Sequence, residues 1–187
     1  MRKLRLNRRK WLLALVCLWL TGGWAVAAES LAGVGEYQVK AAFLYNLIKF
    51  TDWPANSFTS SEAPIVIGIV GEDPFGQTID DLVRGETVCA RPLVIRRLKA
   101  DEDLSRCHVL FISKSEKDRG TQILNQVKRR PVLTVSDTPG YAEQGGMVTL
   151  LLASKTVKLE INQAVAEDAG LRISAKLLKL ARLTKTK

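Results

Sequence analysis

The chain has 187 residues, of which 47% are hydrophobic, and this size and composition suit one domain with an ordinary buried core. Its formal net charge is +9, but residues 1–10 carry six of the positive charges and no negative one. Without that segment, 22 Lys and Arg stand against 19 Asp and Glu, which is a net charge of +3. The remaining charge gives no reason to propose nucleic acid as a partner.

The first 28 residues have the order of a secretory signal peptide. A basic segment is followed by the apolar residues 11–20 and then by small residues, including Ala25, Ala27 and Ala28. We predict that this peptide is removed near these alanines and that residues 29–187 form the exported domain. The alternative is a retained anchor, but an apolar run of about ten residues is shorter than the ~20 that span a bilayer.

Helices and strands alternate through the middle of the chain. The predicted helices cover residues 36–50, 77–83 and 116–129, and a fourth, short one lies between an Asn162 cap and Gly170. A last helix begins at Ser174, with Leu177, Leu178 and Ala181 at helical spacing. The predicted strands cover residues 64–70, 92–98, 107–113 and 131–136, and a hairpin pairs residues 147–152 with 156–161. This order predicts a single α/β domain with a mostly parallel sheet, helices on both faces and a late antiparallel hairpin.

The residues that might carry chemistry favour ordinary structural roles. Cys107 and His108 are adjacent in a predicted strand, so their side chains point to opposite faces and make a poor catalytic pair. The loop Gly71–Gly76 lacks the spacing of a nucleotide-binding loop. Gly145 and Gly146 indicate a tight turn or a close approach of the backbone. We therefore predict no catalytic residue, metal site or cofactor.

The first predicted helix has two apolar faces. Five residues share one face: Tyr37, Ala41, Leu44, Tyr45 and Ile48. Val39, Phe43, Leu47 and Phe50 share the other, and Glu36 and Lys40 separate the two on one side. Because a surface helix needs only one apolar stripe, we predict that the second face meets a second protomer, a C-terminal helix or a membrane partner. The alternative is that both faces are buried within one chain.

Two cysteines remain after export, Cys89 and Cys107. An exported compartment permits a disulfide between them, and only one pairing exists. The bond requires that strands 92–98 and 108–112 are neighbours, yet the connection between them is short for a parallel crossover. The alternative is that Cys107 is a buried free thiol.

Four stretches follow one another that together resemble the YfiR-like family of exported bacterial proteins: "YQVKAAFLYNLIKFTDWP", "IVGEDPFG", "CHVLFIS" and "GGMVTLLLASKTVKLEINQAVAEDAGLRISAKLLKLARL". The resemblance covers about residues 36–183. It implies a non-catalytic periplasmic α/β protein. Well-understood members repress a membrane-bound diguanylate cyclase through its periplasmic part, which lowers cyclic-di-GMP and biofilm formation, and dimers are usual.

The resemblance also implies redox-responsive disulfides, and here the sequence departs from the family. Two of the cysteine positions read Ile65-Val66-Ile67 and Ser136-Asp137-Thr138, so only Cys107 matches clearly. We expect a regulator that binds an inner-membrane signalling protein, such as a diguanylate cyclase or a sensor kinase, and that forms a homodimer. The alternative is a periplasmic module that binds a small molecule at the carboxyl ends of its strands.

Overall fold

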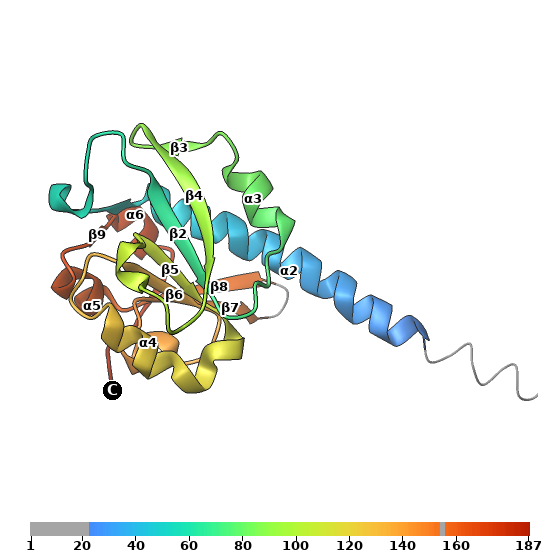
Figure 1. Cartoon of the computed structure of the whole chain (residues 1–187). Helices are drawn as coiled ribbons and strands as arrows, with labels where there is room; N and C mark the ends of the chain where they lie inside the picture. The colour runs from blue at the N-terminus through green and yellow to red at the C-terminus, as the bar shows by residue number, and fades with distance from the viewer. Residues whose placement is uncertain (1–22, 154–155) are drawn as a thin grey trace, which may run out of the picture. The chain divides into compact units, whose positions relative to one another are not determined.

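The computed structural model describes residues 23–153 and 156–187, and Glu36–Lys187 form one compact unit (Figure 1). The α-helices are α2 (Gly23–Lys49), α3 (Gln77–Val83), α4 (Gly120–Gln126), α5 (Gln163–Asp168) and α6 (Ala175–Leu178). The strands are β1 (Thr51–Asp52), β2 (Ile65–Val70), β3 (Thr87–Val88), β4 (Arg91–Leu98), β5 (Val109–Ile112), β6 (Leu133–Ser136), β7 (Val148–Ala153), β8 (Thr156–Ile161), β9 (Arg172–Ile173) and β10 (Arg182–Leu183).

The main sheet has eight strands in the order β10-β8-β7-β6-β5-β2-β4-β3. The central pairs from β4 to β7 are parallel, whereas β7 and β8 form an antiparallel hairpin at one end and β3 and β4 another at the opposite end. A second, two-stranded sheet pairs β1 with β9. The predicted fold class, a mostly parallel α/β domain with a late antiparallel hairpin, is confirmed.

Helices cover both faces of the sheet. On one face, Leu44 and Ile48 of α2 and Ile79 of α3 belong to a core that includes Ile67 of β2. On the other face, Ile123 of α4 belongs to a second core formed by neighbouring strands and loops. Because both faces are buried, strands such as β2 and β5 are apolar at successive positions instead of alternating, as is usual for parallel sheets.

Several predicted local signals are confirmed. The Asn162 side chain accepts a hydrogen bond from the backbone N–H of Val165, which caps α5, and Gly170 has a φ of 78° after its end. Gly145 has a φ of 96°, and a Cβ at Gly146 would lie 2.1 Å from the ring of Tyr141. Gly145 therefore provides the positive φ of a tight turn, and Gly146 allows the backbone to approach the ring of Tyr141 closely.

Two predicted helices are wrong in their extent. The segment predicted as one helix over residues 116–129 is a 3-10 helix at Lys114–Arg119 followed by the shorter α4. The last helix ends at Leu178, and the chain then forms β10, which pairs in parallel with the edge of β8. Backbone pairing at that edge outweighs the helical spacing of the apolar residues that precede it.

A buried ionic cluster attaches α2 to the carboxyl end of β6. Lys40, predicted to separate two helix faces, is instead completely buried, and its ammonium group donates to Asp137 Oδ2 at 2.9 Å. Tyr37 donates to the same oxygen at 2.7 Å, and burial together with this hydrogen bond raises the pKa of Tyr37 far above its usual value. Glu36 also pairs with Lys40, and the largely exposed Lys114 reaches Asp137 Oδ2 at 3.4 Å.

We expect Lys40→Met to destabilise the domain strongly, because the Asp137 carboxylate would stay buried without its main counter-charge. Breaking a buried pair from one side costs about 3–5 kcal/mol of unfolding free energy, which urea denaturation would measure. Lys114→Met is the matched control, since its ammonium group contacts the same oxygen from solvent and should cost less than about 1 kcal/mol. Equal losses in the two variants would contradict the assignment.

Candidate functional site

The second side of α2 is only partly covered. Leu44, Leu47 and Ile48 face the sheet and are completely buried. Tyr45 faces the end of the sheet that holds β3 and β4, because its hydroxyl donates to Glu86 at 2.6 Å. Residues 39, 43 and 50 lie about 120–160° around the helix from Tyr45, at 100° per residue. Their side of α2 therefore faces away from β3 and β4 and partly toward solvent.

The structure separates the four residues predicted for a partner face. Val39 is 46% exposed and Phe50 is 37% exposed, while Phe43 is partly buried against the core. Leu47 is completely buried, so here the prediction is corrected: its side chain points far enough toward the sheet to join the core. Within the compact unit, the second side of α2 thus retains three residues that a partner can contact.

The outer strands add apolar residues on the same side of the sheet. Leu183 of β10 is the register partner of Ile161, and Leu152 of β7 is the partner of Val157 on β8. Paired residues point to the same face, and Ile161 belongs to the core beneath α2. Leu152 is 47% exposed and Leu183 is 55% exposed. We call Val39, Phe43, Phe50, Leu152 and Leu183 the apolar flank.

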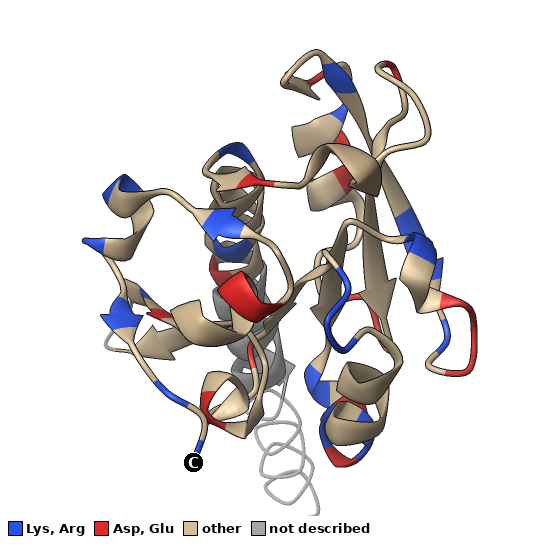
Figure 2. Cartoon of the chain, turned by 90° about the vertical axis from the view of Figure 1, so that its left-hand side faces the viewer, with Lys and Arg blue, Asp and Glu red and all other residues tan. Residues whose placement is uncertain are grey.

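Charges near the apolar flank come mainly from the C-terminal segment. Figure 2 shows Lys and Arg residues along the chain that leads to the C-terminus. Arg182 and Lys187 form ion pairs with acidic residues, Arg182 with Glu160 and both with Glu143. Lys176 and Lys179 are exposed on and after α6. A partner that covers the flank therefore meets an apolar centre with basic side chains close by.

The carboxyl ends of the strands form the other candidate site, because the chain order reverses between β2 and β5. The chain's own side chains fill this position. The hydroxyl of Ser115 accepts a hydrogen bond from the backbone N–H of Glu72 at 2.9 Å. A Cβ at Gly71 would lie 2.4 Å from that hydroxyl and 2.7 Å from Cγ of Glu116. The arrangement therefore leaves little room for a ligand directly at the switch point.

Cys107 and His108 are fully engaged in packing and hydrogen bonding. His108 Nδ1 accepts from the backbone N–H of Val66 at 3.1 Å, and Nε2 lies 3.1 Å from the carbonyl oxygen of Ser57. The Cys107 sulfur lies against β2, where a Cβ at Gly68 would be only 2.7 Å away, and burial raises the pKa of this thiol to about 11. A protonated thiol and an imidazole with both nitrogens bonded do not form a nucleophile–base pair.

The two cysteines are free in the structure, which is the second of the predicted alternatives. Cys89 is exposed in the turn between β3 and β4, and Cys107 is buried just before β5. Strand β2 lies between β4 and β5, so these two strands are two strand spacings, roughly 10 Å, apart. The two cysteines, which precede β4 and β5, are separated by at least this distance. That distance exceeds the ~7 Å between Cα atoms that a disulfide tolerates.

We expect two free thiols in the denatured, unreduced mature chain, and two rates of labelling in the native protein. Cys89 should react rapidly with a thiol reagent, whereas Cys107 should react at least ~100-fold more slowly because it is buried and protonated. Mass spectrometry after alkylation with and without urea measures both. A Cys107→Ala variant should remove only the slow phase. Finding no free thiol would show that a disulfide forms and would contradict the strand arrangement.

The predicted export signal lies mostly outside the described residues, which begin at Gly23. Ala25, Ala27 and Ala28 fall in the first turns of α2, ahead of the compact unit that starts at Glu36. No helix in the described part of the chain is long and apolar enough to cross a membrane.

A family model described as YfiR/HmsC-like matches residues 37–182. The match begins at Tyr37, in the buried cluster on α2, and ends at Arg182, in β10, so it includes every strand of both sheets except the last residue of β10. The chain therefore belongs to the YfiR/HmsC-like family, a regulatory family of the periplasm.

Proposed function

We propose that this member of the YfiR/HmsC-like family is a non-catalytic periplasmic regulator that binds an inner-membrane signalling protein. The partner is a diguanylate cyclase, whose activity the bound domain represses. The observation that carries the proposal is the apolar flank: Val39, Phe50, Leu152 and Leu183 are large apolar residues that stay exposed on the α2 side of the sheet. Exposed apolar surfaces commonly mark protein interfaces. Export and removal of residues 1–28 place the flank in the compartment where the partner exposes its periplasmic part.

The absence of catalysis is part of the proposal. The single histidine has both ring nitrogens occupied, and the neighbouring thiol is buried with a raised pKa. Among the described residues, no three His, Cys, Asp or Glu side chains are grouped closely enough to hold a metal ion. Regulation therefore depends on binding, and the apolar flank also offers the surface for a homodimer, since a two-fold axis beside α2 would pair the flank with itself.

A small-molecule module is a second candidate, because a cavity of about 320 Å³ lies between α4 and α5. Leu124, Met147 and Val165 give it apolar walls, and Lys128 and Arg129 lie at its border. Its size falls at the lower end of the range for ligand pockets. A ligand there would modulate the regulator without contacting the apolar flank.

We expect Val39→Glu and Phe50→Glu to weaken binding to the membrane partner at least ~30-fold, because each places a charge in the centre of the interface. Because each side chain is partly exposed, the unfolding free energies should fall by less than about 2 kcal/mol and both variants should remain folded. Co-purification with the tagged cyclase and cellular cyclic-di-GMP measure the effect, and cyclic-di-GMP should rise. Gln38→Glu is the matched control, since it adds the same charge to an exposed position on the other side of α2. Normal repression by folded Val39→Glu and Phe50→Glu variants would refute the role of the flank.

We expect the mature protein to begin near Ala28, because the small residues before it suit cleavage of the signal peptide. The intact mass of the protein from a periplasmic extract measures this directly. Substitution of Ala25 and Ala27 by bulky residues should slow cleavage and leave the precursor in the membrane fraction. A wild-type protein that keeps residues 1–28 in that fraction would show that the segment is an anchor.

A further inference from the structure

Strand β4 has a free edge. One side of β4 pairs with β2 from Leu93 to Leu98, residue by residue. The other side pairs with β3 only at Arg91 and Pro92. Over the described residues, no strand pairs with Leu93–Leu98 on that side, which leaves most of the strand available on one edge.

The hairpin geometry shows which backbone groups point outward. Cys89 and Ala90 have φ values of 52° and 63°, as in a two-residue turn with both central residues left-handed. Val88 and Arg91 flank that turn and are register partners, so the backbone N–H and C=O of Arg91 face β3. Successive residues of a strand alternate in direction. The N–H and C=O groups of Leu93, Ile95 and Arg97 therefore face the free edge.

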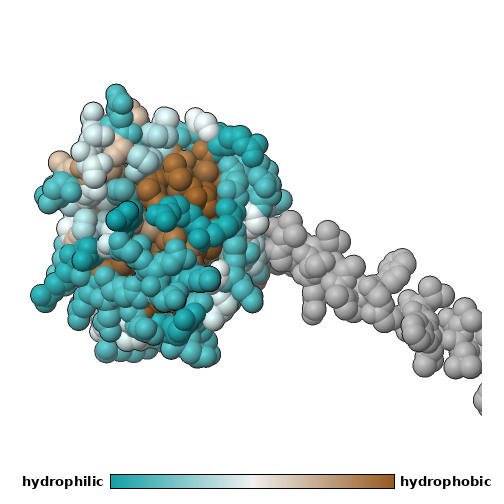
Figure 3. Space-filling model, in the orientation of Figure 1, coloured by the Kyte–Doolittle hydropathy of each residue, from teal (hydrophilic) through white to brown (hydrophobic). Residues whose placement is uncertain are grey.

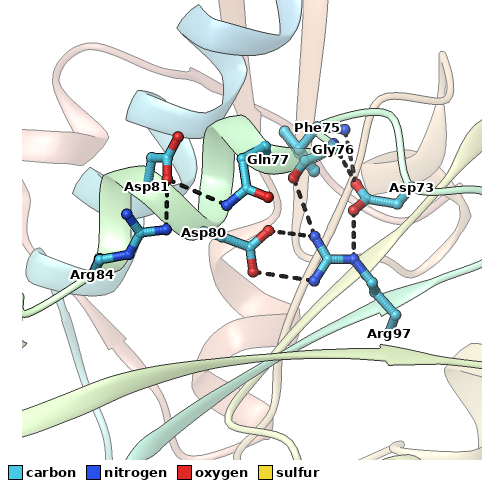
Figure 4. A network of polar contacts seen from close by, with 8 residues as sticks. All are labelled: Asp73, Phe75, Gly76, Gln77, Asp80, Asp81, Arg84 and Arg97. Carbon is cyan, nitrogen blue, oxygen red and sulfur yellow. Dashed lines mark hydrogen bonds and ion pairs between the residues drawn. The ribbon is translucent and has the colours of Figure 1, made fainter.

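Two arginines lie next to the free edge, and only one of them is paired with acidic residues. Arg97 is held over α3 by Asp73 at 2.8 Å and by Asp80 at 2.5 Å (Figure 4). Its guanidinium group is thereby fixed on one face of the sheet. Arg96 points to the opposite face, is exposed, and makes no ion pair with any described residue. Arg96 is thus an uncompensated cation beside the free edge.

Both faces next to the edge can receive side chains. An open groove of about 590 Å³ lies between α3 and the edge, lined by Val83 and Arg84 on one wall and Leu93 and Ile95 on the other. On the other face, Val94 is 40% exposed, and Figure 3 shows an apolar area surrounded by hydrophilic residues over β2 and β4. A strand added here would direct alternate side chains into the groove and toward Val94 and Arg96.

We propose that the free edge of β4 binds an extended segment of a partner protein by strand addition, and that this segment carries apolar side chains toward the groove and a carboxylate toward Arg96. Main-chain hydrogen bonds to Leu93, Ile95 and Arg97 hold the segment, and the side chains select it. The surface is separate from the apolar flank, so the inference goes beyond the proposed function. It rests on that function only in taking the partner to be a protein.

Charge disfavours a second copy of this chain as the occupant. Antiparallel pairing of two β4 strands about Ile95 would place Arg96 of each copy diagonally across from the other, within about 8 Å. The segment from Arg91 to Lys99 contains four basic residues and no acidic one, so the paired edges would repel each other. An acidic strand, in contrast, supplies the carboxylate that Arg96 lacks.

The test is a titration of the mature, isotope-labelled protein with the synthetic peptide Thr-Glu-Val-Glu-Val-Glu-Thr, followed by amide chemical shifts and hydrogen exchange. We expect the amides of Leu93, Ile95 and Arg97 to shift and to exchange at least ~10-fold more slowly at saturation. Arg96→Glu should weaken binding of this peptide at least ~10-fold. The same variant should strengthen binding of a second peptide in which lysine replaces each glutamate. Phe50→Glu should bind as the wild type does, which separates this result from failure of the apolar flank.

A peptide of the same sequence, N-methylated at alternate residues, distinguishes strand addition from simple charge attraction. Methylation removes hydrogen-bond donors and keeps every carboxylate, so strand addition predicts loss of binding. Equal binding of the methylated peptide would overturn the proposal, as would unchanged Leu93, Ile95 and Arg97 amides at ~1 mM peptide. In either case the arginines would serve only to keep the edge from aggregating.

Discussion

The ion pair between Lys40 and Asp137 determines which side of α2 the protein displays. A buried cation can lie only where a buried anion meets it, and Asp137 stands at the end of β6. This single contact sets both the rotation of α2 and its position along the sheet. Rotating the helix by one residue would carry Lys40 away from the carboxylate and turn Phe43 toward the sheet. The exposure of Val39 and Phe50 is therefore a consequence of a polar contact on the buried side of α2.

Tyr37 and Glu36 extend this constraint along the helix. Tyr37 donates to the same carboxylate oxygen and packs edge-on against Phe75, which in turn contacts Phe111 of β5. The start of the compact unit is thus connected through three aromatic rings to the centre of the sheet. Asp137 Oδ1 has no hydrogen-bond partner among the described residues, so the site relies on one oxygen for all of its contacts. The remaining helical turns toward Lys49 are held by apolar packing and by the hydrogen bond from Tyr45 to Glu86.

Much of the fold follows from local patterns in the sequence. The apolar β-branched run at β2 and the caps at Asn162 and Ser174 act over a few residues, and each is found where it was predicted. Features that depend on distant partners were not predictable in the same way. Lys40 resembles any solvent-exposed lysine until Asp137, 97 residues away, is placed beside it. The position of β2 between β4 and β5 likewise depends on sheet order. The short connection after β4 argues against direct pairing of β4 with β5, but it does not identify the strand that lies between them.

The candidate site likewise has a part that local spacing predicts and a part that depends on distant residues. Helical spacing places Val39, Phe43 and Phe50 on one side of α2, but the burial of Leu47 depends on how far that side is rotated toward the sheet. Leu152 and Leu183 join them only through strand register, which links residues that periodicity within one segment cannot relate. The free edge of β4 is a property of the sheet order and of no residue by itself.

The contact between Gly68 and Cys107 makes two positions in the chain depend on each other. A sulfur atom occupies the space that a side chain at position 68 would fill, in a core that packs at the density of an organic crystal. A methyl group at position 68 therefore requires a smaller residue at position 107 and small shifts of Leu98 and Leu110, while a smaller residue at position 107 alone opens a void. In related chains, a larger residue at position 68 should therefore occur together with a smaller residue at position 107. The presence of cysteine just before β5 is then explained by its size, whatever its redox chemistry.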